Sequence, residues 1–311
     1  MIDFKVTQIK LIESYKRLLK HPKVDVIYYK WLKDSIDNAS YCTNIVVLES
    51  EAGKLVRSRT KTCKLPLCPI CAKKRSEDNQ KDVLETMNEI EKEDPNLRYI
   101  HIVLTVKNVV GEELDETINK LNGRHGAFNR FIREKEVKSV VKGWYKAIEV
   151  NTNFKARNFQ LHIHLLMAVD KSYFDEKKGC IDQNKKEWSK LWKKALKINY
   201  LPSVSVKKIE KCKDEEDNVE ETMTLEVAIV AVTKQSAELN DYIIDYDDKE
   251  RLEKLRNDGY KRVVVKTRKQ SEEMTDFAVY YLHRAFRGLR RHSAGGIIKE
   301  KLAEIKKRKK N

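Results

Sequence analysis

The chain is poor in the residues that break regular structure, and it has no long apolar run. Its 311 residues include only 10 glycines and 5 prolines, and no low-complexity tract, so most of the chain is expected to fold. No run approaches the roughly 18 apolar residues of a membrane-spanning helix, and no signal peptide opens the chain. We therefore predict a soluble, cytoplasmic protein without a membrane partner.

Cysteines are few and acidic residues are outnumbered by basic ones, and each observation limits the classes of function that the chain can have. Six cysteines in a cytoplasmic chain indicate metal binding or ordinary packing rather than disulfides. The 48 acidic residues are outnumbered by 64 lysines and arginines, which gives a net charge of +16. Such an excess favours a polyanionic partner, most often nucleic acid, although a general lysine bias would give the same number.

Hydrophobic periodicity predicts helices interspersed with strands. Helices are expected over residues 4–35, 81–93, 112–135, 184–198, 224–245 and 272–291, the last one stopped by the glycine pair at 295–296. Strands are expected over residues 99–106, 144–150, 159–167, 204–209 and 262–265. A short loop joins two of these strands, so we predict an α+β fold with an antiparallel sheet flanked by helices.

A histidine pair lies within the strand expected at residues 159–167. Residues two apart on a strand share a face, so His162 and His164 should point the same way. Two imidazoles side by side on a buried sheet favour a divalent metal, and two hydrogen-bonded core histidines are the alternative. Glu149, on the preceding strand, would lie beside them if the strands form a hairpin. Two imidazoles and a carboxylate suit Mn²⁺ or Mg²⁺, and by affinity also Zn²⁺.

The cysteines form a second cluster. The segment Cys63-Lys-Leu-Pro-Leu-Cys68-Pro-Ile-Cys71 has C-x₄-C-x₂-C spacing, and Cys42 lies 21 residues before its first cysteine. Four thiolates in a reducing compartment are typical of a structural Zn²⁺ site, which would stabilise a small module. A redox pair at residues 68 and 71 is the alternative, but no thioredoxin-like pattern surrounds it. Cys180 and Cys212 show no partner pattern and are expected to be ordinary residues.

Several blocks together resemble one family, the rolling-circle replication initiators of small bacterial plasmids. These blocks are Leu104-Thr-Val-Lys-Asn108, Trp144-Tyr-Lys-Ala-Ile-Glu-Val150, His162-Ile-His164, the cysteine segment CKLPLCPICAKKR, and the closing leucines, arginines and glycine pair of residues 282–296. The histidine–hydrophobe–histidine triplet is the pattern of the HUH endonuclease superfamily. The resemblance spans roughly residues 40–298.

The resemblance implies a fold and an activity. The fold would be an HUH-type antiparallel sheet with a small zinc module, divided into an N-terminal helical region (1–40), the zinc module (41–80), a nuclease and origin-binding domain (81–298) and a basic C-terminal tail (299–311). The activity would be nicking of one strand of the plasmid's double-strand origin by a tyrosine. That attack would leave a 5′-phosphotyrosine and a free 3′-OH, with the metal offsetting charge on the phosphate.

The nucleophile is where this sequence departs from the family pattern. The family places its tyrosine in a helix of the form Glu-x-x-Lys-Tyr-x-x-Lys, and the matching segment runs from Glu226 to Lys234. Counting from its two ends places Val230 or Ala231 at the tyrosine position, and neither can attack. The nucleophile is then substituted, absent from an inactive relative, or displaced. Among existing tyrosines Tyr242 ranks first, because Glu238 four residues earlier would share its helical face as a general base.

The basic surface would bind single-stranded or hairpin origin DNA. Its expected members are Lys73, Lys74, Arg75, Lys234, Arg284, Arg287, Arg290 and Arg291. The resemblance also leaves open a host helicase and a homodimer as partners. Two other readings remain: an HUH transposase or relaxase with the same metal site, and a zinc-stabilised DNA-binding regulator without catalysis.

Overall fold

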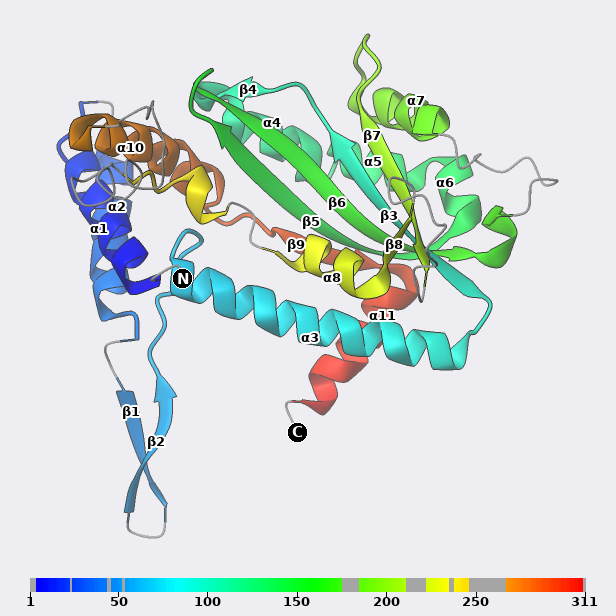
Figure 1. Ribbon diagram of the computed structural model, residues 1–311, viewed down its shortest axis with the longest axis horizontal. Helices are drawn as coiled ribbons and strands as arrows, with labels where there is room; N and C mark the ends of the chain where they lie inside the picture. The colour runs from blue at the N-terminus through cyan, green and yellow to red at the C-terminus, as the bar shows by residue number, and fades with distance from the viewer. Residues whose placement is uncertain are drawn as a thin grey trace, which may run out of the picture. The chain divides into compact units, whose positions relative to one another are not determined.

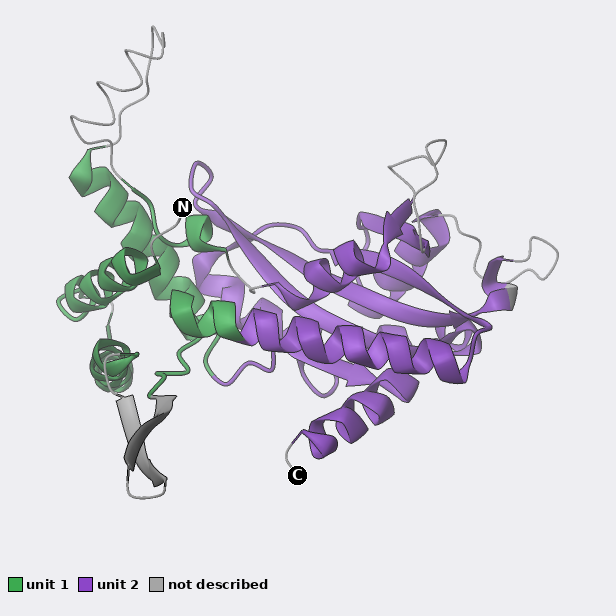
Figure 2. Ribbon diagram, turned by 60° about the horizontal axis from the view of Figure 1, so that its bottom comes forward, with its two compact units in different colours: residues 1–74, 237–287 green, residues 75–236, 288–311 purple. Residues whose placement is uncertain are grey.

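Segments far apart in the sequence combine into each of two units (Figure 2). The computed structural model describes residues 4–22, 24–43, 46–51, 54–174, 185–210, 222–234, 238–245 and 267–309. Unit 1 comprises residues 1–74 and 237–287, and unit 2 comprises residues 75–236 and 288–311. The predicted helical region (1–40) and residues 41–74 of the predicted zinc module (41–80) therefore belong to one unit, together with a later segment that the sequence placed in the nuclease domain, whereas residues 75–80 belong to unit 2. Cys180, Cys212 and the strand expected at 262–265 lie outside the described residues.

Unit 1 is mainly helical. Its described elements are α1 (Phe4–Leu18), α2 (Val26–Tyr41), the antiparallel hairpin β1 (Val46–Glu51) and β2 (Lys54–Thr60), the first turn of α3 (Pro69–Glu93), the 3₁₀ helix η3 (Leu239–Asp241) and α10 (Arg268–Ala285). The single helix expected over residues 4–35 is two helices. They separate near Pro22, and Asp25 begins the second by accepting a hydrogen bond from the Tyr28 amide at 2.7 Å.

Within the described residues, unit 2 contains a seven-stranded sheet (Figure 1). Its strands are β3 (Leu97–Thr105), β4 (Val109–Val110), β5 (Val141–Asn153), β6 (Asn158–Asp170), β7 (Val204–Glu210), β8 (Thr222–Thr224) and β9 (His292–Gly295). The order is β8-β7-β3-β6-β5-β9, and β4 pairs with β6. Only the β7–β8 pairing is parallel, so the sheet is mostly antiparallel, as the sequence predicts.

Helices cover both faces of this sheet (Figure 1). One face packs against α3, α8 (Leu225–Thr233) and α11 (Gly296–Arg308), with Met87, Leu166 and Val232 fully buried between them. The other face lies against α4 (Gly111–Asn122), α5 (Ala127–Arg133), α6 (Lys135–Val140) and α7 (Lys185–Leu196). Leu161, Ile163 and Leu165 of β6 are almost completely buried, as expected for the core-facing side of the histidine strand.

The chain beyond residue 285 differs from the sequence prediction. The glycine pair does not stop α10, which already ends at Ala285; it joins β9 to α11. Gly295 lies against the ring of Trp144, and Gly296 has φ +58° and faces the Lys142 carbonyl, so a side chain would collide at either position. The expected basic tail is mostly helix α11. Its Ile298 and Ile305 are fully buried, and its Arg308 binds Glu89 of α3 at 2.5 Å.

Candidate active site and metal centres

The two histidines and Glu149 lie on the same face of neighbouring strands in unit 2. Strands β5 and β6 form the expected hairpin, in a register that places Glu149 opposite His162 and Ala147 opposite His164. The Nε2 atom of His164 is 2.5 Å from Oε2 of Glu149, and the rings of His162 and His164 are 6.3 Å apart between centroids. The sheet therefore places two imidazoles and one carboxylate on one face, with Glu149 in contact with His164, although the ligand atoms of all three do not lie within 4.8 Å of one another.

The electrostatics of this group favour the protonation states that a metal needs. Burial would raise the pKa of Glu149, but hydrogen bonds from His164 and Lys234 lower it to about 2. Burial lowers the pKa of His162, although Glu149 opposes this shift. The carboxylate is thus ionised and the His162 imidazole neutral at pH 7, which are the forms that coordinate a divalent cation. In this respect the residues fit the metal that the family resemblance implies.

A third histidine, His101 on β3, joins the group, and the sequence analysis did not assign it a role. Its Nε2 lies 3.4 Å from Nδ1 of His164, and burial, with His164 next, lowers its pKa to about 3. A neutral His101 can donate its Nε2 proton to Nδ1 of His164, so that the His164 proton lies on Nε2 and is donated to Glu149. Strand alternation from Tyr99 could have placed it on the metal face, but a single histidine on a strand carries no distinctive pattern.

Helix α8 lies over the same face of the sheet and brings in Lys234. Its Ala228, Ile229 and Val232 are buried against the sheet, whereas Val227 and Val230 are 53% and 48% exposed. At the end of the helix the Lys234 ammonium reaches Oε1 of Glu149 at 2.5 Å. Ala231 and Val230 precede Lys234 by three and four residues, so they share its helical face beside the candidate metal ligands. The segment matched to the family's tyrosine helix therefore adjoins the histidine cluster through Lys234, but it contains no tyrosine, and its Thr233 hydroxyl is buried and donates to the Ile229 carbonyl at 2.7 Å.

The structure argues against Tyr242 as a displaced nucleophile. Its side chain is 1% exposed and its hydroxyl donates to the Leu67 carbonyl at 2.9 Å. Glu238 does not share an α-helical face with it, because the predicted 224–245 helix ends at Thr233. Instead Glu238 caps the short helix η3, in which Asp241 in turn accepts from its amide at 2.8 Å. A buried, hydrogen-bonded phenol is poorly placed to attack a phosphodiester.

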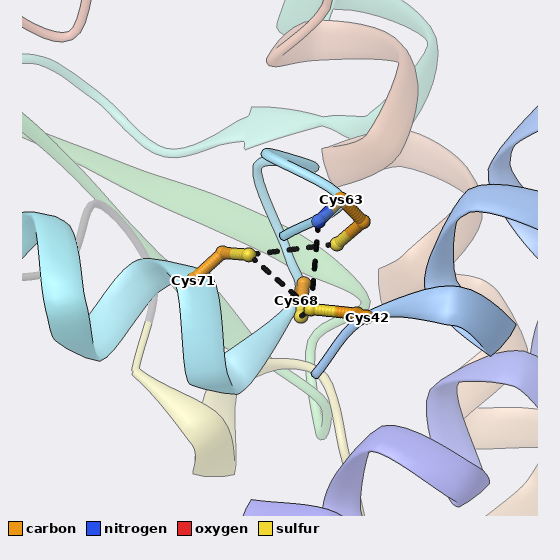
Figure 3. Close-up of side chains that lie close together, drawn as sticks. All are labelled: Cys42, Cys63, Cys68 and Cys71. Carbon is orange, nitrogen blue, oxygen red and sulfur yellow. Dashed lines mark hydrogen bonds between the residues drawn. The ribbon is translucent and has the colours of Figure 1, made fainter. Parts of the chain in front are cut away.

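The four cysteines form a cluster in unit 1 (Figure 3). Cys42 Sγ lies 3.8 Å from Cys68 Sγ and 3.5 Å from Cys71 Sγ, and Cys63 Sγ lies 3.6 Å from Cys71 Sγ. Four sulfurs around a tetrahedral ion with bonds of about 2.3 Å are about 3.8 Å apart, so the cluster has the size of a zinc site. The ligand atoms of these four cysteines all lie within 4.8 Å of one another. Among the described residues, this is the group of three or more His, Cys, Asp or Glu side chains that is close enough to hold a metal ion.

The basic residues expected to bind DNA are distributed over both units. In unit 1, Lys73, Lys74, Arg284 and Arg287 are exposed, and the two arginines lie over the rings of Tyr28, Tyr280 and Trp31. In unit 2, Arg290 is exposed, whereas Arg75 and Arg291 are half-buried, and burial lowers the pKa of Arg291 to about 10. Lys234 is bound to Glu149 and so belongs to the histidine site rather than to an open basic surface.

These features define a class: a two-unit α+β protein with a histidine–carboxylate cluster on a mostly antiparallel sheet, a cysteine cluster in a helical unit, and no helix among the described residues that could cross a membrane. Comparison with known families is more specific. The chain belongs to the Replication protein family (Rep_1), whose model matches residues 54–311. This membership confirms the predicted resemblance to plasmid replication initiators.

Individual relatives agree with the family assignment. The chain is 31% identical over 243 residues to "Protein rep" of a Bacillus species, which covers 75% of this chain and 74% of the relative. It is 29% identical over 261 residues to "Protein rep" of Bacillus amyloliquefaciens, covering 81% of this chain and 67% of the relative. A 34% identical "Protein rep" from Streptococcus pneumoniae matches over 52% of this chain, which spans only 49% of that relative. No solved structure matches.

Proposed function

We propose that this replication initiator binds the double-strand origin of its plasmid through an HUH-type site built for strand nicking, with His162, His164 and Glu149 as metal ligands. The observation that carries the proposal is the shared sheet face, on which Glu149 lies opposite His162 and within 2.5 Å of His164. The net charge of +16 supports a nucleic-acid partner. Family membership supports replication rather than transposition or conjugative transfer as the use of this site.

Each residue of the site has a distinct part in this proposal. A bound Mn²⁺ or Mg²⁺ would polarise the scissile phosphate and offset its developing negative charge. His162 and His164 would supply neutral nitrogens and Glu149 an ionised oxygen, while His101 holds the His164 ring. Lys234, at the end of α8, would lie close enough to the carboxylate to contact a phosphate oxygen once Glu149 binds the metal.

The proposal includes a missing nucleophile. The family pattern implies a tyrosine on the helix that α8 matches, and this chain has Val230 and Ala231 at that place. We propose that the chain holds origin DNA and metal but does not nick from α8. A DNA-binding regulator without catalysis is the second candidate, and the lack of a tyrosine in α8 favours it. The histidine–carboxylate cluster favours the first, because a binding module needs no open metal site.

The cysteine cluster is proposed to hold a structural Zn²⁺. Cys42, Cys68 and Cys71 are almost completely buried, and sulfur separations of 3.5–3.8 Å suit one tetrahedral ion. The ion would join the end of α2 to the start of α3 within unit 1. It would thereby stabilise the unit without taking part in the chemistry.

Metal titration tests the proposed site directly. Calorimetry on zinc-loaded protein should detect one further Mn²⁺ site, and His164→Ala should weaken its binding at least tenfold. His125→Ala, which removes a histidine outside the cluster, is the matched control. Circular dichroism checks that both variants remain folded. If wild type and His164→Ala bind Mn²⁺ alike, and hairpin DNA binds equally well without metal, the regulator is the correct function.

A further inference from the structure

Unit 2 contains a cavity that lies outside the histidine site. It has a volume of about 860 Å³ and lies among the segment after β3, helix α4, the α4–α5 turn, and the segment that follows α7. Its walls are largely apolar and include Val106, Val109, Leu121, Ala127, Leu196 and Ile198. Apolar walls with a few polar groups, at this volume, are typical of a site for a small organic group.

An aromatic ring in the cavity wall is held in a fixed orientation. The Tyr200 hydroxyl accepts a hydrogen bond from the Lys107 amide at 3.2 Å, and the Lys107 ammonium lies 4.5 Å from the centre of the same ring. Lys107 is exposed and Tyr200 is half-buried. A positioned ring beside an exposed cation is the arrangement that binds single-stranded nucleic acid, because a base stacks on the ring and the cation attracts the backbone.

Two other basic side chains at the cavity bind acceptors within the protein, and the carboxylates of Asp115 and Glu116 also line it. The Arg130 guanidinium donates to the Ala195 carbonyl at 2.8 Å and also to the His125 carbonyl. Lys120 pairs with Glu116 at 2.6 Å. The aromatic ring and the apolar wall, rather than a concentration of charge, are therefore what a ligand would meet. An uncharged, flat, aromatic group fits this lining better than a phosphate.

The cavity and the histidine site lie on opposite faces of the sheet near the end of β3, because α4, α5 and the segment after α7 line the cavity and α8 covers the histidine face. Thr105, the last residue of β3, pairs with His162 of β6, and the next two residues, Val106 and Lys107, line the cavity. Two residues of extended chain span only about 7 Å. A strand of DNA whose phosphate lies at His162 would therefore reach this cavity by passing around the end of the sheet.

We propose that the cavity holds one unpaired nucleobase of the bound single strand, stacked on Tyr200, where the strand passes around the end of the sheet from the phosphate at the histidine site. This inference rests on the proposed function, since it takes single-stranded origin DNA as the ligand. It adds a site at which the protein contacts a base rather than the backbone. Such a contact would help to fix which phosphate reaches the metal.

Substitution of the ring tests the stacking. With a fluorescein-labelled thymidine 12-mer as the probe, Tyr200→Leu should weaken binding by roughly 5- to 100-fold, the usual worth of one stacked base. The slope of log Kd against log salt should not change, because no phosphate contact is lost. Tyr200→Phe, which keeps the ring, should bind within about twofold of wild type. Leu201→Ala, an exposed neighbour outside the cavity lining, controls for local disturbance.

A photocrosslink provides a test on the unaltered protein, should Tyr200→Leu fail to fold. A thymidine 12-mer in which one base is 5-iodouracil should crosslink to Tyr200 on irradiation. Thymidine 5′-monophosphate at the same nucleotide concentration should not displace the 12-mer; if it does, the cavity is a site for free nucleotides and the inference is wrong.

Failure of this inference and failure of the proposed function give different results. If wild type and Tyr200→Leu bind the 12-mer equally and crosslinks map elsewhere, the inference fails while the proposed function stands. If wild type does not bind single-stranded DNA at all, the proposed function fails and the inference with it.

Discussion

Glu149 is the residue on which the candidate active site depends most. It is 5% exposed, and it binds both the His164 ring and the Lys234 ammonium at 2.5 Å. Its pKa of about 2 means that it stays ionised throughout the physiological range. The sequence predicted this residue from strand alternation alone, because Glu149 and the histidines have the parity that one hairpin register would align. His101 was missed because its contact with His164 arises from the β3–β6 pairing, which no local pattern shows.

Lys234 should compete with a divalent cation for Glu149. Lys234→Met removes a positive charge beside the carboxylate, so we expect Mn²⁺ to bind about three- to tenfold more tightly. That corresponds to about 1 kcal/mol once the partial exposure of the lysine and the resulting screening are allowed for. Lys208→Met, which removes the 2.5 Å partner of Glu210 on β7, is the matched control. Unchanged or weaker Mn²⁺ binding by Lys234→Met would contradict the proposed ligand role of Glu149.

His283 should make the stability of the protein depend on pH. Its ring stacks on Trp31 and its nitrogens contact Tyr28 and Ser35, while burial, with Arg287 next, lowers its pKa to about 3. The unfolded chain takes up the proton below about pH 6.5 but the folded chain does not, so stability falls as the pH drops from 6.5. The expected loss from this residue is roughly 2 kcal/mol by pH 5.

Urea unfolding at pH 7 and pH 5 measures this loss. His283→Gln should be less stable than wild type at pH 7 but should lose less stability between the two pH values. His101, His162 and His292, whose pKa values are also lowered, contribute to the dependence that remains. Equal pH dependence in wild type and His283→Gln would show that His283 is not kept neutral by the fold.

Helix α11 is stabilised by contacts with residues far away in the sequence. The sequence suggested a basic tail, because lysines and arginines dominate residues 299–311 and only a few apolar residues interrupt them. The helix is nevertheless ordered, because Ile298 and Ile305 are fully buried and its basic face binds acidic residues of α3 such as Asp82 and Glu89. The partner acids lie some 200 residues earlier in the chain, which local charge patterning does not reveal.

Gly296→Ala should destabilise the start of α11 through two effects. An alanine there would have to adopt a backbone φ of +58°, and its Cβ would collide with the Lys142 carbonyl. We therefore expect the substitution to lower the free energy of unfolding by about 2 kcal/mol or more. Gly288→Ala shares the left-handed backbone, with φ +64°, but its side chain would meet nothing within 4 Å. It should therefore cost only about 1 kcal/mol. Thermal unfolding compares the two, and equal losses would mean that the close approach of β5 to Gly296 does not matter.

The cysteine cluster should hold one zinc ion and stabilise the elements around it. The purified protein is expected to contain one Zn²⁺ per chain by atomic emission, and its removal by a strong chelator should lower the melting temperature. Cys71→Ser should lose the zinc, whereas Asn38→Ser, on the exposed surface of α2, should retain it. A zinc-free wild-type protein with an unchanged melting temperature would show that the cluster is ordinary packing.

At the scale of the whole molecule, some features of the fold could be predicted from the sequence and others could not. The individual strands, the histidine hairpin and the cysteine grouping follow from local patterns, since each depends on alternation or spacing within a few dozen residues, whereas pairings such as β3 with β7 and β5 with β9 join distant segments. The division into units does not, because residues 237–287 fold with the N-terminal segment, as in the 2.8 Å pair between Arg17 and Asp276. A chain that leaves a unit and returns to it carries no compositional mark at the crossing points.

The central claim is that the protein has a metal site for nicking beside a helix that lacks the nucleophilic tyrosine. Whether the protein forms a covalent adduct with DNA tests this claim most directly. Wild-type protein, Val230→Tyr and Ala231→Tyr would each be incubated with a labelled origin hairpin and Mn²⁺, followed by a denaturing gel and peptide mapping. We predict that wild type binds the hairpin without forming an adduct. At least one variant should form an adduct at the substituted position, and a further His162→Ala change should abolish it. An adduct of wild type at another tyrosine, or none in either variant although the hairpin binds, would contradict the account.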